Sequence, residues 1–185
     1  GCNQGSIPVG NPSTMKRITV LLAEDHTIVR EGFRKMLEME SDLQVVGEAQ
    51  DGRQAIALAM ELSPDVVLMD IAMPGLNGLE ATRQVLKRCP ETKILILSAH
   101  NDDAYIQNAT DSGAVGFLLK QTSAHDVCLA IREVNKGNIY FSPAISRRLR
   151  RLNSNAEELP GTFKKNAVKL SSREIEVLQL IAEGK

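Results

Sequence analysis

Short apolar segments alternate with helix-like segments along residues 17–137, and this alternation limits the chain to few folds. Apolar runs bounded by polar and turn residues predict buried strands. The expected strands are Ile18–Ala23, Leu43–Ala49, Val66–Asp70, Ile94–Ser98 and Val115–Leu119. The expected helices are, roughly, His26–Glu40, Gly52–Leu62, Gly78–Arg88, Asp102–Asp111 and Ala124–Lys136. Strands and helices that alternate with short links form βαβ units, so the sequence predicts an α/β fold whose parallel sheet carries helices on both faces.

The expected strands differ in how continuously apolar they are, and this difference predicts their order. Val66–Met69 and Ile94–Leu97 are apolar at every position, as expected of central strands. The segment LQVVGE at residues 43–48 contains polar residues and a glycine, which indicates an edge strand. With right-handed crossovers, these properties predict a flavodoxin-like, doubly wound five-stranded sheet in the order 2-1-3-4-5. The switch point then lies between the first and third strands.

Four of the strands end in polar residues suited to phosphoryl chemistry. Glu24 and Asp25 follow the first strand, Asp70 ends the third, Ser98 ends the fourth and Lys120 follows the fifth. Ligands bind outside the carboxyl ends of the strands in an open α/β sheet, so these side chains should converge on one pocket. Three acids repel one another unless a cation lies among them. The sequence therefore predicts a divalent metal and a negatively charged ligand at this edge.

Asp70 is the candidate nucleophile, because a carboxylate can attack phosphorus and form an aspartyl phosphate. Asp25 and Asp70 would bind Mg²⁺ directly, whereas Glu24 would reach it through water. The main-chain carbonyl of Ala72 could fill a further coordination position. Asp70 also has a simpler interpretation as an ordinary loop acid, and Asp25 as the N-cap of the first helix.

Lys120 and Ser98 are the residues expected to contact the phosphoryl group. Lys120 would pair with Asp70 and then with phosphate oxygens, and Ser98 would hydrogen-bond to the group once it is present. Taken singly, Lys120 could be a surface lysine and Ser98 a helix-entry residue. The joint placement of these residues at the strand ends favours a phosphoryl-transfer site.

The stretches VLLAEDH, DVVLMDIAMPGLNGLEA, ILILSAH and GAVGFLLK carry a family resemblance by their order and spacing. Through them, residues 17–137 resemble the receiver domain of two-component response regulators. The resemblance implies that Glu24, Asp25 and Asp70 are the acidic metal-binding set and that Asp70 is the phosphoacceptor. It also implies that Ser98 is the switch hydroxyl and that Lys120 is the lysine of the site.

The resemblance further implies a switch aromatic at Phe117, which swings inward when the hydroxyl moves toward phosphate. From the residues alone, Phe117 is an aromatic of the fifth strand that packs in the core or at an edge. Ala72 departs from the family pattern, which often has a polar side chain two residues past the acceptor, so the dephosphorylation rate is expected to differ. Receiver chemistry needs no side-chain base, so His26, His100 and His125 are interpreted as helix-start and loop residues.

The residues after Gly137 differ in charge and pattern from those before. Residues 15–140 carry 13 Lys/Arg and 18 Asp/Glu, whereas residues 141–185 carry 9 and 5. A basic segment suggests proximity to nucleic acid, although a solvated helix face explains the arginines equally well. Ser142 and Pro143 can start a basic helix, as N-cap and first helical residue, that should fade near Asn153. The composition of Asn155–Asn166 indicates a linker.

The final segment, LSSREIEVLQLIAEGK, resembles the opening of a LuxR-type helix-turn-helix domain. Ser171 and Glu174 have the spacing of a capping box at the start of its helix. In such domains a later helix reads the major groove. We therefore expect residues 1–14 to be a tag or a disordered tail, 15–137 a receiver domain, 138–167 a linker with a basic helix, and 168–185 the start of a truncated helix-turn-helix domain.

Together the two resemblances indicate a NarL/FixJ-type transcriptional regulator that a sensor histidine kinase phosphorylates on Asp70 with Mg²⁺ as cofactor. Its output would be DNA binding through a complete C-terminal domain, not through this chain alone. We expect a switch with at most slow autodephosphorylation, not an enzyme. Homodimers could form through the first and fifth helices, or through the fourth helix and fifth strand. A cytoplasmic location is expected, because no apolar stretch approaches the roughly 20 residues of a membrane span and three scattered cysteines form no disulfide framework.

Two other classes of function use the same fold. One is an interaction module that signals without phosphate, which the intact acid set argues against. The other is an enzyme, either a flavin carrier or a haloacid-dehalogenase-type phosphatase. Glu24 and Asp25 would repel a flavin phosphate, and Ala72 stands where such a phosphatase needs a second acid.

Overall fold

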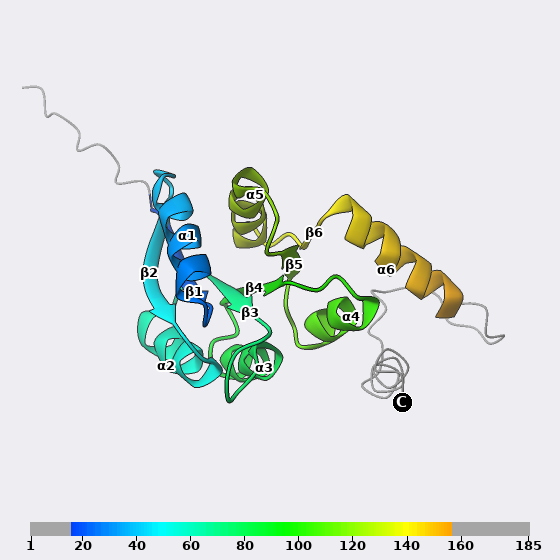
Figure 1. Ribbon diagram of the computed structural model, residues 1–185, viewed down its shortest axis with the longest axis horizontal. Helices are drawn as coiled ribbons and strands as arrows, with labels where there is room; N and C mark the ends of the chain where they lie inside the picture. The colour runs from blue at the N-terminus through cyan, green and yellow to red at the C-terminus, as the bar shows by residue number, and fades with distance from the viewer. Residues whose placement is uncertain (1–15, 157–185) are drawn as a thin grey trace, which may run out of the picture.

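The computed structural model describes residues 16–156 of the 185-residue chain, and these form an α/β sheet protein (Figure 1). The strands are β1 (Ile18–Ala23), β2 (Leu43–Ala49), β3 (Val66–Asp70), β4 (Lys93–Ser98), β5 (Gly116–Leu119) and β6 (Tyr140–Phe141). The helices are α1 (Thr27–Glu38), α2 (Gly52–Leu62), α3 (Gly78–Arg88), α4 (Asp103–Asp111), α5 (Ala124–Asn135) and α6 (Pro143–Ala156). All strand pairs are parallel, in the order β2-β1-β3-β4-β5-β6.

The predicted topology is confirmed, with one strand added. Strands β1, β2 and β3 and helices α2 and α3 have the predicted bounds, and the other elements predicted within residues 17–137 differ by one or two residues at one or both ends. The sheet has six strands where five were predicted. The additional strand, β6, is short and pairs with β5 through Gly116↔Tyr140 and Phe117↔Phe141. Two residues are too few to show the alternation by which a strand is recognised in sequence.

Two helical layers enclose the sheet: α1 and α5 on one face, and α2, α3 and α4 on the other (Figure 1). Successive strand residues supply the two layers. In β1, Val20 and Leu22 pack with the α1 and α5 side, whereas Leu21 and Ala23 pack with the α2, α3 and α4 side. Burial on both faces explains why the central strands are apolar throughout. Each fully buried large aliphatic side chain contributes about 1.5–3 kcal/mol to folding.

The start of α3 fits closely against the end of β3. Asn77 caps the helix by accepting a hydrogen bond from the Glu80 N–H at 2.9 Å. Any Cβ at position 78 would collide with the main-chain carbonyl of Asp70. Gly78 therefore allows α3 to begin directly behind Asp70, and this close approach fixes the segment that follows the strand.

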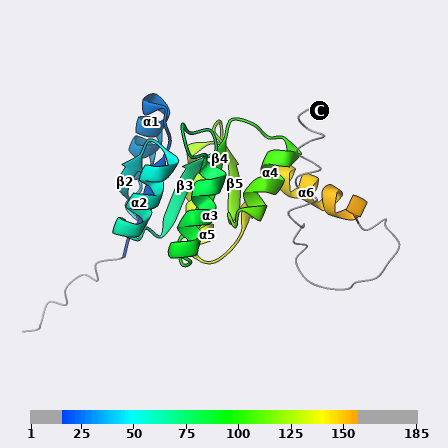
Figure 2. The same cartoon turned by 90° about the horizontal axis from the view of Figure 1, so that it is seen from below.

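Helix α6 packs on the sheet domain and runs beside α4 in both views (Figures 1 and 2). As predicted, Pro143 is its first residue, and the Ser142 Oγ accepts from the Ile145 N–H at 3.4 Å. Ile145 is buried in the core that contains Phe117. Arg148 Nε lies 2.8 Å from Asp103 Oδ1 of α4. The helix continues to Ala156, past the predicted end near Asn153.

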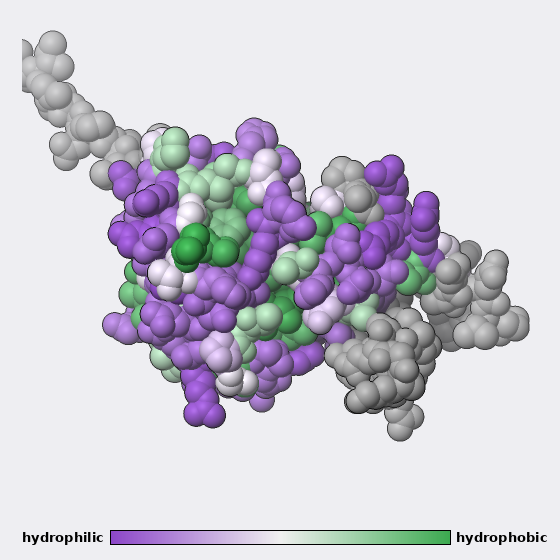
Figure 3. Space-filling view, viewed as in Figure 1, coloured by the Kyte–Doolittle hydropathy of each residue, from purple (hydrophilic) through white to green (hydrophobic). Residues whose placement is uncertain are grey.

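The described surface gives no sign of a membrane-spanning segment. Figure 3 shows mostly hydrophilic residues on one side of the molecule, with small, separate apolar areas. Among residues 16–156, no helix has the length and apolar character that crossing a bilayer requires. The expectations for residues 1–14, for most of Asn155–Asn166 and for residues 168–185, including Ser171 and Glu174, lie outside the described residues.

Candidate functional site

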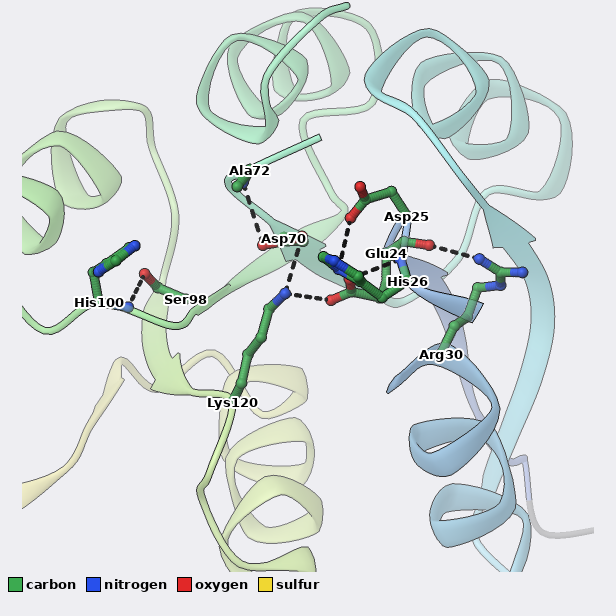
Figure 4. Close-up of polar contacts among 9 residues, drawn as sticks. All are labelled: Glu24, Asp25, His26, Arg30, Asp70, Ala72, Ser98, His100 and Lys120. Atoms are coloured by element: carbon green, nitrogen blue, oxygen red, sulfur yellow. Dashed lines mark hydrogen bonds and ion pairs between the residues drawn. The ribbon is translucent and has the colours of Figure 1, made fainter. Parts of the chain in front are cut away.

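The first predicted cluster, Glu24, Asp25 and Asp70, comes together at the carboxyl ends of β1 and β3. The two strands are neighbours, with Ala23 opposite Met69, so the residues that follow lie side by side. Glu24 is 2% exposed and Asp70 1% exposed. Figure 4 shows these acids pointing toward one another.

Lys120 provides the positive charge between the two buried acids. Its Nζ lies 2.8 Å from Glu24 Oε2 and 3.1 Å from Asp70 Oδ2. Lys120 directly follows β5, which pairs with β4. The Lys120 N–H continues this pairing by donating to the Ser98 carbonyl at 2.9 Å. The predicted pairing of Lys120 with Asp70 is thus present, and Glu24 is a second partner that the sequence did not indicate.

The shared ammonium affects the two acids differently. Burial, followed by the charge of Glu24, raises the pKa of Asp70 to about 6 even though Lys120 opposes the change. Burial also disfavours the Glu24 carboxylate, but hydrogen bonds from Lys120 and His26 outweigh it and lower the pKa of Glu24. In the same way, Glu24 and Asp70 overcome burial and raise the pKa of Lys120. At neutral pH Glu24 is therefore ionised and Asp70 is mostly ionised, so two buried carboxylates face the single positive charge of Lys120.

His26 joins the acids, although the sequence indicated only a helix-start residue. Its Nδ1 lies 3.0 Å from Glu24 Oε1 and 3.1 Å from Asp25 Oδ1. His26 is also the N-cap of α1, without a side-chain capping bond. The alternative interpretation of Asp25 as the N-cap is therefore wrong, and its carboxylate is free for the site.

The oxygen atoms of this cluster suit a hard divalent cation. One ligand atom from each of Glu24, Asp25, His26 and Asp70 lies within 4.8 Å of the others. Glu24 Oε2, Asp25 Oδ1 and Asp70 Oδ2 are buried. Their close contacts are with the Lys120 ammonium for two of them and with the His26 ring for Asp25, which leaves further lone pairs on each oxygen. Buried carboxylate oxygens with spare lone pairs are what Mg²⁺ binds. Ala72, two residues after Asp70, contacts the same carboxylate, because its N–H donates to Asp70 Oδ1 at 3.3 Å.

Ser98 lies across the pocket from the acids, at the end of β4 (Figure 4). Its side chain is buried, and its Oγ accepts a hydrogen bond from the His100 N–H at 3.0 Å. As the acceptor in this bond, the hydroxyl keeps its own proton available for a second partner. The site therefore has a hydroxyl donor on the side opposite the acids.

Phe117 lies three residues before Lys120 and is fully buried. It belongs to the core on the α2, α3 and α4 side, with Ile106 and Ile145. A cavity of about 230 Å³ is lined by Phe117, Ile145 and neighbouring residues of β5, β6 and α5. Phe117 thus belongs to the strand that leads to Lys120, and its side chain shares a core cluster and a cavity with Ile145 of the first turn of α6.

Arg30 is a contact of the site that the sequence analysis missed. It is buried on α1, and its Nη1 donates to the main-chain carbonyl of Glu24 at 2.8 Å. A signal was present in the sequence, because Arg30, Phe33 and Leu37 recur with helical spacing. The structure buries all three residues. An arginine in the apolar stripe of a helix indicates a buried charge that needs a partner.

The acid cluster is distinct from the groove between helices α2 and α3. A groove of about 620 Å³ lies between α2 and α3, lined by residues that include Arg53, Met60, Leu76 and Arg88. It has no acid and no contact with the strand ends. Charge and geometry, not volume, therefore identify the functional site.

Comparisons with known proteins agree with the fold. A family model described as the response regulator receiver domain matches residues 20–132. Transcriptional regulatory protein LiaR of Bacillus subtilis is 41% identical over 172 residues, covering 91% of this chain and 78% of that protein. Transcriptional regulatory protein DegU of Brevibacillus brevis is 37% identical over 179 residues, covering 91% of this chain and 76% of that protein.

Solved structures show the same likeness. The crystal structure of a LuxR-family two-component response regulator from Aurantimonas sp. SI85-9A1 superposes with a TM-score of 0.71 at 33% identity. The superposition covers 75% of this chain and 99% of that chain.

Proposed function

The chain belongs to the response regulator receiver family of two-component systems, as a NarL/FixJ-type member, and from this premise we propose that Asp70 is its phosphoacceptor. The observation that carries the proposal is the convergence of Glu24, Asp70 and Lys120 at neighbouring strand ends. Response regulators are generally switches rather than enzymes, and the relatives LiaR and DegU are named as transcriptional regulatory proteins. Hydrolysis of the aspartyl phosphate would then be slow and would reset the switch.

Glu24, Asp25 and Asp70 would hold Mg²⁺, with Glu24 acting through water and the Ala72 main-chain carbonyl as a further ligand. The ion would neutralise charge on the phosphoryl oxygens during transfer. The buried carboxylate oxygens of these acids, which lie close together and keep lone pairs beyond their contacts with Lys120 and His26, support this assignment. The chain itself supplies the geometry, since β1 and β3 bring the acids together.

The chemical step is a displacement at phosphorus. An Asp70 carboxylate oxygen attacks the phosphohistidine of a sensor kinase, the new O–P bond forms, and the N–P bond to the imidazole breaks with its electron pair left on nitrogen. Asp70 must be ionised to attack. Its pKa of about 6 leaves most of it ionised at neutral pH and makes the oxygen more basic than that of an ordinary aspartate.

Lys120 and Ser98 would bind the phosphoryl group once it is on Asp70. Lys120 is already 3.1 Å from Asp70 Oδ2 and would pair with a phosphoryl oxygen. The Ser98 hydroxyl would donate its free proton to another oxygen while its Oγ still accepts from the His100 N–H. Phe117, the proposed switch aromatic, lies on β5 and belongs to the same core cluster as Ile145 of α6. A movement of Phe117 after phosphorylation would therefore shift α6, the helix that leads toward the C-terminal segment.

The proposed domain arrangement follows from the same premise. Residues 15–137 would be the receiver, 138–167 the linker with α6, and 168–185 the start of a LuxR-type DNA-binding domain. A sensor histidine kinase in the cytoplasm would be the phosphodonor, and DNA would be bound through the complete C-terminal domain. A homodimer is a further proposed state.

Phosphorylation by a small-molecule donor tests the proposal directly. Wild-type protein with acetyl phosphate and Mg²⁺ should gain one phosphoryl group by intact mass, and hydroxylamine should remove it, as expected of an acyl phosphate. Asp70→Asn should gain none. The control Asp111→Asn removes an exposed acid at the end of α4 and should behave like wild type. Equal phosphorylation of Asp70→Asn, or none of wild type, would contradict the proposal.

A further inference from the structure

Arg30 is the one buried cation among residues 16–156 whose contacts the proposed chemistry does not use. Its residue exposure is 7%, although it lies on a surface helix. A buried charge is unfavourable unless it is paired and hydrogen-bonded. The buried guanidinium of Arg30 therefore depends on the contacts that it makes.

Those contacts tie together three elements at the metal-binding end of the sheet. Arg30 Nη1 donates to the Glu24 carbonyl at 2.8 Å, and Nε lies 3.3 Å from Glu48 Oε1 on β2. The Glu24 N–H donates to the Ala49 carbonyl, also on β2, at 3.0 Å. Both main-chain groups of Glu24 are thus held, one by the strand ladder and one by Arg30. Figure 4 shows the contact of Arg30 with the Glu24 carbonyl.

The Glu24 carbonyl belongs to the peptide unit that joins Glu24 to Asp25. Peptide units are planar, so holding this oxygen fixes the orientation of the whole unit, and with it the last dihedral angle of Glu24 and the position of the Asp25 Cα. That position determines where the Asp25 side chain starts, after the strand has ended and ladder hydrogen bonds have stopped. Arg30 is therefore placed to orient Asp25 without touching it.

We propose that Arg30 is a positioning residue for the metal-binding acids Glu24 and Asp25, an inference that rests on the proposed function of the site. Groups behind the ligands of a metal commonly fix ligand orientation, and their loss typically lowers metal affinity by about 10–100-fold. The planar guanidinium suits the task because Nη1 donates to the carbonyl while Nε, which makes no hydrogen bond, stays within ion-pair distance of the Glu48 carboxylate. A lysine offers one nitrogen and would satisfy only part of this set.

Arg34 provides a matched control one turn further along α1. It lies near the same acid, with Nη1 3.2 Å from Glu48 Oε2, and it also pairs with Glu38. Its side chain is 49% exposed and makes no contact with Glu24 among the described hydrogen bonds. Replacing Arg34 removes the same charge and a tie to β2, but leaves the Glu24 carbonyl held.

Mg²⁺ titration of the full chain, followed by amide NMR, tests the inference. Arg30→Met should bind Mg²⁺ at least about tenfold more weakly than wild type, Arg30→Lys should fall between the two, and Arg34→Met should stay within about twofold. Before Mg²⁺ is added, the Asp25 and His26 amides of Arg30→Met should shift while those of Asp70 and Lys120 keep their wild-type positions. This local pattern in a folded protein would not arise from a general loss of stability.

The failures of the two proposals are distinguishable. Wild-type affinity in Arg30→Met, or an equal loss in Arg34→Met, would overturn the role of Arg30 while leaving the proposed function intact. If wild type itself does not respond to Mg²⁺, the proposed metal site fails and the inference fails with it.

Discussion

The acid pocket and the α6 side of the sheet are held by different forces. At the ends of β1 and β3, Glu24, Asp70 and Lys120 form buried ion pairs, and Arg30 holds the main chain. At the other edge, α6 is held by burial of Ile145 in the core and by the Arg148–Asp103 ion pair.

This difference suits a switch with an input and an output. Ion pairs at fixed distances define where a cation and a phosphoryl group bind, and they respond strongly to an added charge. Apolar contacts are less directional, so a helix held by them can shift at small cost. Ser98 and Phe117 lie between the two regions and belong to neighbouring strands.

The largest expected effect is on the charged side. Replacing Lys120 by Met leaves the buried acids without their counter-charge, which should lower the free energy of unfolding by roughly 3–5 kcal/mol in the absence of divalent cations. Mg²⁺ should stabilise Lys120→Met more than wild type, because it neutralises the same carboxylates. Denaturant unfolding with and without Mg²⁺ measures both effects. If Lys120→Met were as stable as wild type in the presence of a chelator, the buried ion pairs would not be what holds the acid pocket.

The next effect is on the apolar side. Ile145→Ala removes a buried side chain of α6 and should cost roughly 2–4 kcal/mol. Hydrogen exchange should show the loss first in α6 and β6, while the Mg²⁺ affinity of the acid pocket stays near that of wild type. Uniformly faster exchange, with weaker Mg²⁺ binding, would show that the two regions are not separable.

A smaller effect concerns pH. The pKa of Asp70 is about 6 in the folded protein, against 3.8 for an ordinary aspartate, so the folded protein binds an extra proton between these values. The contribution of Asp70 to the free energy of unfolding should therefore be about 2 kcal/mol larger near pH 4 than at neutral pH. This contribution should be lost as the pH rises through about 6. Asp70→Asn lacks this slope, so the difference between the urea midpoints of the two proteins should change across this range. Parallel curves would contradict the assignment of the raised pKa to Asp70.

The smallest effect concerns the ion pair of α6. Arg148 and Asp103 are both partly exposed, so Arg148→Ala should lower stability by less than about 1 kcal/mol. The thermal midpoint, compared with that of Ile145→Ala, gives the measurement. A loss as large as that of Ile145→Ala would mean that charge, not burial, holds α6.

Much of the fold could be predicted because strand pattern and topology are local properties. Val66–Asp70 is apolar up to the acid that ends it, so both the strand and that acid could be recognised in the sequence. The same reasoning placed Glu24 and Asp25 beside Asp70, because the first and third strands are neighbours in a doubly wound sheet.

The remaining features depend on contacts between distant residues. Strand β6 has two residues and exists only because Tyr140 meets β5. The pairing of Lys120 with Glu24 as well as Asp70 depends on side-chain conformation, which strand order does not fix. The Arg30 contact was detectable only as a charge in an apolar helical stripe, and its partner, a main-chain carbonyl, has no sequence signature.

Amide NMR of the full chain with Mg²⁺ and beryllofluoride, an analogue of the phosphoryl group, tests the central claim that Asp70 receives phosphate and that α6 responds. In wild type, the amides of Asp70, Ser98 and Lys120 should shift together with those of Phe117 and Ile145. Asp70→Asn should show neither set of shifts. An unchanged wild-type spectrum, or an equal response in Asp70→Asn, would contradict the phosphoacceptor role, and shifts confined to the acid pocket would contradict the link to α6.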